Sequence, residues 1–286
     1  TVKPGSHIIS ILPMAHMYGM SFEFIYEFLS GVHVYYLTRI PSPAIISQAL
    51  QEVKPIIMIA VPLVIEKIIR KKVFPKIQNN KMRLLLNMPV INKKVRAKIR
   101  EQVYQAFGGN LYEIIIGGAA LNGEIENFLR MIEFPYTVGY GATECGPIIC
   151  YRDWHTFAKG SCGQAALHQE VRIDSPDPAN VAGEILTKGP NVLLGYYKNE
   201  EDTARTIDKE GWFHTGDLGY KDKDGYFYIT GRKKNVIVLM NGKNVFPEEI
   251  EQELNVLPYK EEAIIVGIPN AEDERDLVVT LKLVYN

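Results

Sequence analysis

Short apolar runs alternate with helical patterns over the first half of the chain. The runs are HIISIL at 7–12, VHVYYL at 32–37, IIMIAV at 56–61 and LYEIIIGG at 111–118. Between them lie stretches in which apolar residues recur every three or four positions, namely MSFEFIYEFL at 20–29, PAIISQALQEV at 43–53 and GEIENFLRMI at 123–132. This alternation predicts βαβ units and a mostly parallel, covered sheet of the α/β class over residues 1–150.

The pattern changes after Cys150. Brief runs with frequent Gly and Asp, at 169–174, 183–189 and 224–231, predict an antiparallel, β-barrel-like subdomain over residues 151–232. Further on, NVIVLM at 235–240, the helical pattern PEEIEQELNV at 247–256 and apolar runs at 261–269 and 276–285 predict the start of a small α+β C-terminal domain over residues 233–286.

Composition changes this picture little. The chain has 286 residues, of which 47% are hydrophobic and 23% charged, as expected for a globular protein of about two domains. Its three cysteines, at 145, 150 and 162, have no CxxC spacing, which argues against a disulfide framework or a zinc site and favours a cytoplasmic location. No apolar run approaches the ~20 residues that span a bilayer.

Positive charge is concentrated between Ile65 and Glu101, where 12 Lys or Arg stand against 2 Glu, although the net charge of the chain is −1. Val95, Ile99 and Val103 recur at every fourth position with basic residues between them, which predicts an amphipathic helix. Its basic face is either a solvated surface or a site of peripheral contact with an anionic membrane or a phosphorylated ligand. Nucleic acid is not expected as a partner, because the segment lacks interleaved aromatic residues.

Two glycine-rich turns follow apolar runs, GGAALN at 117–122 and GYGATE at 139–144. Glycine lets a ligand lie against the backbone, whose N–H groups bind phosphate, while Thr143 could bind an anion and Glu144 a cation. Ligands of open parallel sheets bind beyond the carboxyl ends of the strands, so the two turns predict one nucleotide or phosphate pocket. The alternative is a tight loop whose Thr-Glu begins a helix.

Two later motifs offer charged side chains. GWFHTGDLG at 211–219 places Asp217 in a turn after two aromatic residues, where its two oxygens could accept hydrogen bonds from both hydroxyls of a ribose. GRKKNVIVLMNGKNVFPEEIE at 231–251 puts Arg232 at the joint between the second and third segments. The alternatives are a structural Asp-Leu-Gly turn and a basic linker.

Taken in order, LPMAHMYG at 12–19, GGAAL, GYGATE, GEI at 183–185, GWFHTGDLG and the 231–251 motif resemble the adenylate-forming superfamily of acyl-CoA synthetases, peptide-synthetase adenylation domains and luciferases. The similarity extends over nearly the whole chain. LPMAHMYG, VPLVIEKI at 61–68 and NGKNVFPEEIE at 241–251 are most similar to long-chain fatty acid:CoA ligases. The resemblance implies an AMP-forming ligase that joins a fatty acid to CoA through an acyl-adenylate, with ATP or AMP, Mg²⁺ and CoA as ligands.

The resemblance also implies roles in the first two segments. Thr143 would bind the AMP phosphate, Glu144 would bind Mg²⁺, and His16 would stand near the acyl carboxylate, with a structural loop histidine as the alternative. The residues implied to surround the nucleotide are Gly117, Gly118 and Ala119 along the adenine, Tyr140 against its ring, and Gly139, Gly141 and Ala142 of the same turn.

Further roles are implied toward the C-terminal part. Asp217 would bind the ribose hydroxyls with the help of Arg232. Lys234 matches the hinge about which the small C-terminal domain swings, and Gly242 would leave space for the pantetheine arm of CoA.

Two family motifs have no counterpart here, because the phosphate loop would precede Thr1 and the lysine that contacts the reacting carboxylate would follow Asn286. We therefore expect a fragment that forms no acyl-adenylate alone. Several alternatives stay open: a ligase for aryl or short acids, an enzyme that loads a carrier protein, a nucleotide-binding scaffold without catalysis and, more remotely, a metal hydrolase using Cys150, His155 and Cys162.

Overall fold

The computed structural model describes residues 2–77, 89–240, 243–254, 260–270 and 277–285. The chain forms two compact units, Thr1–Lys159 and Gly160–Asn286. Among the helices of the described residues, none has both the length and the apolar character needed to cross a membrane.

A five-stranded parallel sheet forms the centre of the first unit, with strand order β2-β1-β3-β4-β5. Its strands are β1 (His7–Ser10), β2 (His33–Tyr36), β3 (Ile57–Ala60), β4 (Glu113–Ile116) and β5 (Tyr136–Val138). Four of the five lie in the apolar runs quoted above, so the predicted α/β class is confirmed.

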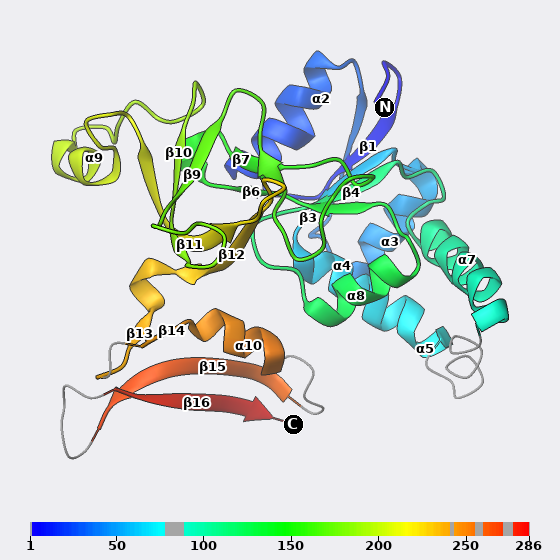
Figure 1. Ribbon diagram of the computed structural model, residues 1–286. Helices are drawn as coiled ribbons and strands as arrows, with labels where there is room; N and C mark the ends of the chain where they lie inside the picture. The colour runs from blue at the N-terminus through cyan, green and yellow to red at the C-terminus, as the bar shows by residue number, and fades with distance from the viewer. Residues whose placement is uncertain (1, 78–88, 241–242, 255–259, 271–276, 286) are drawn as a thin grey trace. The chain divides into compact units, whose positions relative to one another are not determined.

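Helices connect these strands, and Figure 1 shows α3, α4 and α8 on the same face of the sheet. The helices are α3 (Pro43–Val53), α4 (Pro62–Ile68), α5 (Phe74–Ile77), α7 (Pro89–Ala106) and α8 (Gly123–Met131). Ser42 caps α3 and Asn122 caps α8, each by accepting a backbone N–H of the first turn.

The core of this unit is aliphatic and aromatic. Leu50, Ile65, Phe107 and Ile125 are fully buried between the helices and the sheet. Each such side chain contributes about 1.5–3 kcal/mol by leaving water. The predicted amphipathic helix is confirmed as α7, which buries Ile99 and Val103 and exposes Lys93, Lys94, Arg96 and Lys98.

The helical stretch after β1 consists of α1 (Met17–Gly19), a π-helical segment η1 (Met20–Ile25) and α2 (Tyr26–Leu29). A second π-helical segment, η2 (Ile69–Val73), lies between α4 and α5. The burial along η1 and α2 is unusual, because Glu23 and Glu27 are buried whereas Phe28 and Leu29 are 73% and 79% exposed. The first unit ends with an antiparallel pair, β6 (Tyr140–Gly141) and β7 (Ile148–Tyr151).

The second unit contains an open antiparallel sheet in the order β12-β11-β10-β9. Its strands are β9 (Glu170–Asp174), β10 (Gly183–Lys188), β11 (Phe213–Lys221) and β12 (Phe227–Arg232), with β8 (Gln164–Ala165) before them and α9 (Glu200–Thr206) between β10 and β11. The antiparallel β structure predicted for this part of the chain is confirmed.

The last part of this unit is mixed α and β, as predicted. A 3₁₀ turn η4 (Lys233–Asn235) precedes the short pair β13 (Ile237–Val238) and β14 (Asn244–Val245). Helix α10 (Pro247–Leu254) then packs on a hairpin of β15 (Lys260–Pro269) and β16 (Leu277–Tyr285) (Figure 1). The Ile265 N–H donates to Glu251 Oε1 at 2.8 Å, which joins the helix to the hairpin.

Candidate functional site

The two glycine-rich turns leave neighbouring strands at the same edge of the parallel sheet. Strands β4 and β5 pair in the register Ile116 opposite Val138. The Gly117 N–H donates to the Ala60 carbonyl at 3.0 Å, and the Gly139 N–H donates to the Ile116 carbonyl at 2.8 Å. The turns therefore lie side by side at the carboxyl ends of the strands, where open parallel sheets bind ligands.

The first turn packs against a tyrosine that the sequence did not single out. The Tyr18 hydroxyl donates to the Ile115 carbonyl at 3.1 Å. A Cβ on Gly117 would lie 3.0 Å from the Tyr18 ring, so the ring fits closely against this glycine. Burial, with a smaller contribution from the charge of Glu23, raises the pKa of the Tyr18 hydroxyl, which is therefore a neutral donor. Gly118, at φ +86°, and Ala119 are exposed beyond this contact.

The second turn requires glycine at Gly141, because a Cβ there would lie 1.9 Å from the Pro147 carbonyl oxygen. The Ala142 N–H donates to that same carbonyl at 2.8 Å, which closes the turn. Tyr140, between Gly139 and Gly141, is 8% exposed.

Thr143 and Glu144 begin a short 3₁₀ turn, η3 (Thr143–Cys145). Thr143 is exposed and Glu144 is partly buried. The Ser21 hydroxyl of η1 donates to the Gly146 carbonyl at 3.3 Å, one residue past this turn. An exposed hydroxyl and a carboxylate thus stand next to each other at the end of the glycine-rich backbone.

His16 belongs to the same edge of the sheet. It caps α1, where its Nδ1 accepts the Tyr18 N–H at 3.1 Å, and its side chain is exposed. Because Tyr18 contacts the first turn and Ser21 contacts Gly146 just after the second, the helical stretch capped by His16 lies against both segments.

Glu23 anchors the loop that leads from β1 to His16. Its carboxylate accepts the Ser10 hydroxyl at 2.9 Å, the Ile11 N–H at 3.1 Å and the Leu12 N–H at 2.9 Å. Burial raises the pKa of Glu23 to about 7, although these hydrogen bonds oppose the shift. Sequence reasoning missed this residue, because its partners lie on the preceding strand.

In the second unit, Asp217 and Arg232 are brought together across strands β11 and β12, where they are directly opposite. Arg232 Nε lies 2.8 Å from Asp217 Oδ1, and the two side chains are 56% and 10% exposed. The prediction of a turn at Asp217 was wrong: the residue lies within β11, beside Gly216 at φ +71°. At this point β11 pairs with β12 through Asp217 and Arg232, whereas its register with β10 shifts between Glu184 and Leu186. The Asp217 N–H donates to Thr215 Oγ1 at 3.1 Å.

The remaining implied positions lie beyond β12. Lys234 is exposed in η4, directly after β12. Gly242 lies outside the described residues.

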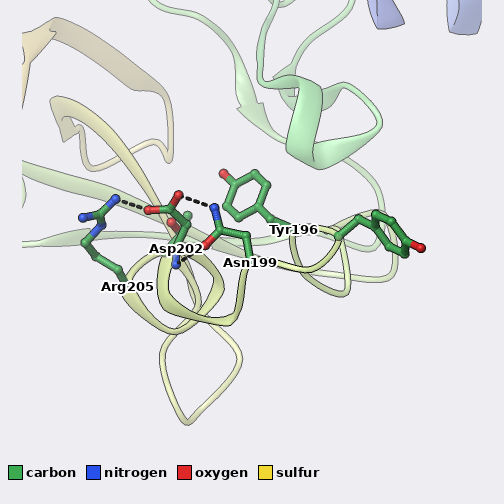
Figure 2. Close-up of a pocket in the computed structure, with 6 residues that line it drawn as sticks. Tyr196, Asn199, Asp202 and Arg205 are labelled. Atoms are coloured by element: carbon green, nitrogen blue, oxygen red, sulfur yellow. Dashed lines mark hydrogen bonds and ion pairs between the residues drawn. The ribbon is translucent and has the colours of Figure 1, made fainter.

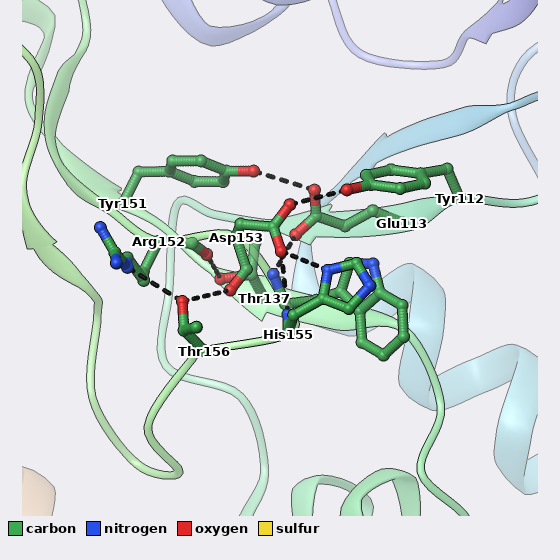
Figure 3. A network of polar contacts seen from close by, with 9 residues as sticks. Tyr112, Glu113, Thr137, Tyr151, Arg152, Asp153, His155 and Thr156 are labelled. Atoms are coloured by element: carbon green, nitrogen blue, oxygen red, sulfur yellow. Dashed lines mark hydrogen bonds and ion pairs between the residues drawn. The ribbon is translucent and has the colours of Figure 1, made fainter. Parts of the chain in front are cut away.

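A polar network surrounds Glu113, at the amino end of β4 and hence at the end away from Gly117 (Figure 3). The buried Glu113 carboxylate accepts the Tyr151 hydroxyl at 2.9 Å and the Trp154 N–H at 3.0 Å. Burial raises its pKa to about 7. Nearby, Asp153 accepts the Tyr112 hydroxyl at 2.9 Å and lies 2.5 Å from His155 Nδ1.

These contacts give His155 a carboxylate partner rather than metal ligands. Cys150 and Cys162 are buried and form no disulfide among the described residues. The described residues contain no group of three or more His, Cys, Asp or Glu that could hold a metal ion. The metal-hydrolase alternative therefore has no support in the described part of the chain.

A surface pocket of about 500 Å³ lies in the second unit, near the start of α9. Figure 2 shows its polar side chains turned toward one another: Asp202 pairs with Arg205 and accepts the Asn199 amide at 2.6 Å. Tyr196, Tyr197 and Thr206 complete the lining. None of the candidate site residues lines this pocket, so we do not assign it to nucleotide binding.

Comparison with known proteins agrees with this geometry. The sequence model of the family described as AMP-binding enzyme matches residues 1–197. The chain belongs to the AMP-binding enzyme family. The matched region contains His16, both glycine-rich turns and the Thr143–Glu144 pair, whereas Asp217 and Arg232 lie beyond it.

Relatives of this AMP-binding enzyme chain include ligases for different acids. Long-chain-fatty-acid–CoA ligase 4 of Saccharomyces cerevisiae is 28% identical over 97% of this chain and 42% of its own length. Feruloyl-CoA synthase of an Amycolatopsis species is 30% identical over 69% of this chain and 41% of its own length. The chain thus spans less than half the length of these curated relatives.

The fold of this AMP-binding enzyme chain is found in solved structures. O-succinylbenzoate coenzyme A synthetase from Bacillus subtilis, in complex with ATP and magnesium ion, superposes with a TM-score of 0.76 at 22% identity. The match covers 98% of this chain and 52% of the synthetase. This likeness confirms the predicted mixed α/β fold, and the structure has a parallel sheet with further small sheets.

Proposed function

We propose that the chain is part of an ATP-dependent, AMP-forming acid–CoA ligase. The observation that carries the proposal is the pair of glycine-rich turns that leave adjacent strands β4 and β5 at one edge of the sheet, ending in Thr143 and Glu144. Membership of the AMP-binding enzyme family supports the assignment of this edge to a nucleotide.

In this proposal the first turn lies along the adenine. Gly117, Gly118 and Ala119 offer backbone without bulky side chains, and the Tyr18 ring holds Gly117 from behind. Gly139, Tyr140, Gly141 and Ala142 form the other wall. The exposed Thr143 hydroxyl donates to the α-phosphate, whose negative charge makes it a strong acceptor.

The donor set at the second turn fits a magnesium ion. Glu144 offers hard carboxylate oxygens, and Mg²⁺ is usually held by one or two carboxylates together with substrate phosphates. When bound, the ion would offset negative charge on the phosphate oxygens.

Asp217 and Arg232 are proposed to hold the ribose. Asp217 Oδ1 faces Arg232 Nε, and a carboxylate accepts several hydrogen bonds, so both ribose hydroxyls could donate to it. Lys234 in η4 is proposed as the hinge and Gly242 as the gap for the CoA arm.

The chemistry runs in two steps. A carboxylate oxygen of the acid attacks the α-phosphorus of ATP, the bond to the β-phosphate oxygen breaks, and pyrophosphate leaves. The CoA sulfur then attacks the acyl carbon, the bond to the AMP oxygen breaks, and the thiol proton passes to solvent. His16, exposed at the start of α1, is proposed to stand beside the acyl carboxylate.

We propose a long-chain fatty acid as the acid, supported by the similarity to the yeast long-chain ligase. An aryl acid is the second candidate, supported by the similarity to feruloyl-CoA synthase. Palmitate, ferulate and acetate, each supplied to the full-length protein with ATP, Mg²⁺ and CoA, would separate these classes by the rate of acyl-CoA formation.

The test of the site is a pair of substitutions, Thr143→Ala and Glu144→Gln, in the full-length protein. Removing one donor aimed at developing charge lowers kcat by about 100-fold. The control is Glu52→Gln on the exposed face of α3. Wild-type rates in both site variants would contradict the assignment. Transfer only to a carrier protein would favour the carrier-loading alternative, and AMP binding without pyrophosphate release would favour a scaffold.

Peripheral membrane contact by the basic segment is a separate part of the proposal. Lys93, Lys94, Arg96 and Lys98 are exposed on α7, whereas Arg100 pairs with Glu133. Binding to vesicles that contain anionic lipid should weaken as salt is raised, because exposed charges are screened. Binding that ignores both salt and anionic lipid would contradict it. A cytoplasmic location is proposed with it.

A further inference from the structure

Glu184, the acidic residue of the GEI motif, has no role in the function proposed above. It nevertheless contacts the segments that carry Asp217 and Lys234, two residues with proposed roles. It is on β10, the strand next to β11, and its side chain is 8% exposed. Burying a carboxylate costs free energy unless charged or polar groups surround it. The contacts of Glu184 therefore indicate its structural role.

Its two oxygens serve two different segments. Oε1 accepts the Gly216 N–H at 3.0 Å, immediately before Asp217. Oε2 accepts Lys233 Nζ at 2.9 Å, immediately before Lys234, and lies 3.2 Å from His214 Nδ1.

The backbone at Gly216 depends on such side-chain bonds. Strands β10 and β11 shift register between Glu184 and Leu186, so regular ladder bonds are interrupted there. The Thr215 hydroxyl donates to the Ile185 carbonyl at 2.8 Å, and Glu184 supplies the partner of Gly216. These two bonds fix the bulge that aims Asp217.

The negative charge of Glu184 is paired with the Lys233 ammonium. Burial raises the pKa of Glu184, but the hydrogen bonds from Lys233, His214 and the Gly216 N–H, together with the charge of Lys233, outweigh burial and hold the pKa below its usual value. Asp208, whose Oδ2 is 3.9 Å from His214 Nε2, is the other acidic group facing this cluster. Loss of Lys233 would leave the buried Glu184 carboxylate without its lysine partner, which favours either its reorientation or its protonation.

We propose that Glu184 is a positioning residue that links the hinge segment at Lys233 to the Asp217 segment through one shared carboxylate. While Lys233 is bonded to Glu184, the carboxylate holds the Gly216 N–H and thereby orients Asp217. When Lys233 moves away, the Gly216 backbone and the Asp217 side chain become less restrained. The inference rests on the proposed function where it assigns the ribose to Asp217 and the hinge to Lys234.

Hydrogen exchange on this chain tests the link without any turnover. Lys233→Met removes the ammonium, and because Lys233 is 64% exposed the chain should still fold. Lys233 has no direct bond to Gly216, so an effect there passes through Glu184. We expect the Gly216 amide to exchange about 10-fold to 100-fold faster, the range for a lost charge-assisted hydrogen bond. Glu184→Gln should give the same result.

Two variants separate this link from general loosening. Lys233→Arg keeps the charge and should restore the wild-type exchange of Gly216. Lys209→Met, on an exposed lysine of the same unit, should change nothing. Exchange at Gly216 within twofold of wild type in both Lys233→Met and Glu184→Gln would overturn the proposal.

A kinetic measurement relates the link between Lys233 and Gly216 to function. In the full-length protein, Lys233→Met should raise the KM for ATP about 10-fold and change the kcat for CoA transfer from preformed acyl-adenylate less than twofold. Equal loss in both steps would contradict a positioning role. A wild-type protein that binds no AMP would contradict the proposed function, while the exchange comparison would still support or overturn the link.

Discussion

Glu27 is expected to make the first unit less stable as pH rises. The residue is 1% exposed in α2, and its Oε2 has no hydrogen-bond partner among the described residues. Burial, together with the charge of Glu23 one turn earlier, raises the pKa of Glu27 from 4.5 to about 7. The native state therefore favours the neutral carboxylic acid.

The sign of the pH dependence follows from linkage. Because the pKa of Glu27 is higher in the native than in the unfolded chain, its contribution to stability is fully present below about pH 4.5 and is lost as pH rises through about 7. The whole shift corresponds to about 3 kcal/mol, of which about 2 kcal/mol falls between about pH 5.5 and about pH 8.5. Glu27→Gln stays neutral throughout and removes this loss.

The assay is urea unfolding at both pH values, followed by the fluorescence of Trp154. The chain has two tryptophans, one in each unit, so a Trp212→Phe background reports on the first unit alone. Burying the Gln amide has a cost that does not depend on pH. It therefore shifts the free energy of unfolding equally at both pH values and leaves the pH dependence unchanged. The control is Glu52→Gln, on an exposed carboxylate. Parallel pH profiles for wild type and Glu27→Gln would refute the reasoning.

Three further predictions concern the site itself. Gly141→Ala should destabilise the first unit by more than about 2 kcal/mol in urea unfolding, because its Cβ would overlap the Pro147 carbonyl. Tyr18→Phe should cost about 1 kcal/mol in the same assay through loss of one hydrogen bond. Asp217→Asn, which weakens the pair with Arg232 and removes a charged acceptor, should lower AMP affinity at least about 10-fold in calorimetry.

Each of these changes has a matched control. Gly123→Ala introduces a Cβ that meets no atom within 4 Å, so it should leave stability unchanged or slightly higher. Tyr26→Phe removes a hydroxyl from a side chain that is 49% exposed, and Asp224→Asn removes an exposed charge from the second unit. A control that loses as much as its partner would show that the expected contact is not the cause.

The sequence predicted the parallel sheet and the adjacency of the two turns because both depend on local signals. Apolar runs bounded by glycine define strands such as β4, and parallel strands place their carboxyl ends at one edge. A shared site for Asp217 and Arg232 was implied only by the resemblance, and their direct ion pair was not predicted. The setting of Asp217 within β11 was missed, because Thr-Gly-Asp is a local turn signal that pairing with β12 overrides.

The contacts that hold the site in place could not be read from the sequence. Tyr18 reaches a carbonyl 97 residues away, and no local pattern encodes that distance. Periodicity predicted a helix near 20–29 but did not say which face is buried, and the buried face carries Glu23 and Glu27. Glu184 was part of a quoted motif, but its two partners come from segments that only the folded sheet brings together.

With His16 placed beside the acid as proposed above, the Tyr18 contact has a consequence for engineering acid specificity. The segment after β1 supplies His16. Tyr18 of this segment packs against the first turn, and Glu23 accepts the N–H groups of Ile11 and Leu12. If only His16 and its immediate neighbours were exchanged between homologues, the new residues would lie on Tyr18 and Glu23 contacts that belong to a different sequence. A transplant of residues 10–23, matched to the end of β4 in the recipient, would carry Tyr18 and Glu23 along with His16. The contacts that hold His16 in place would then move with it.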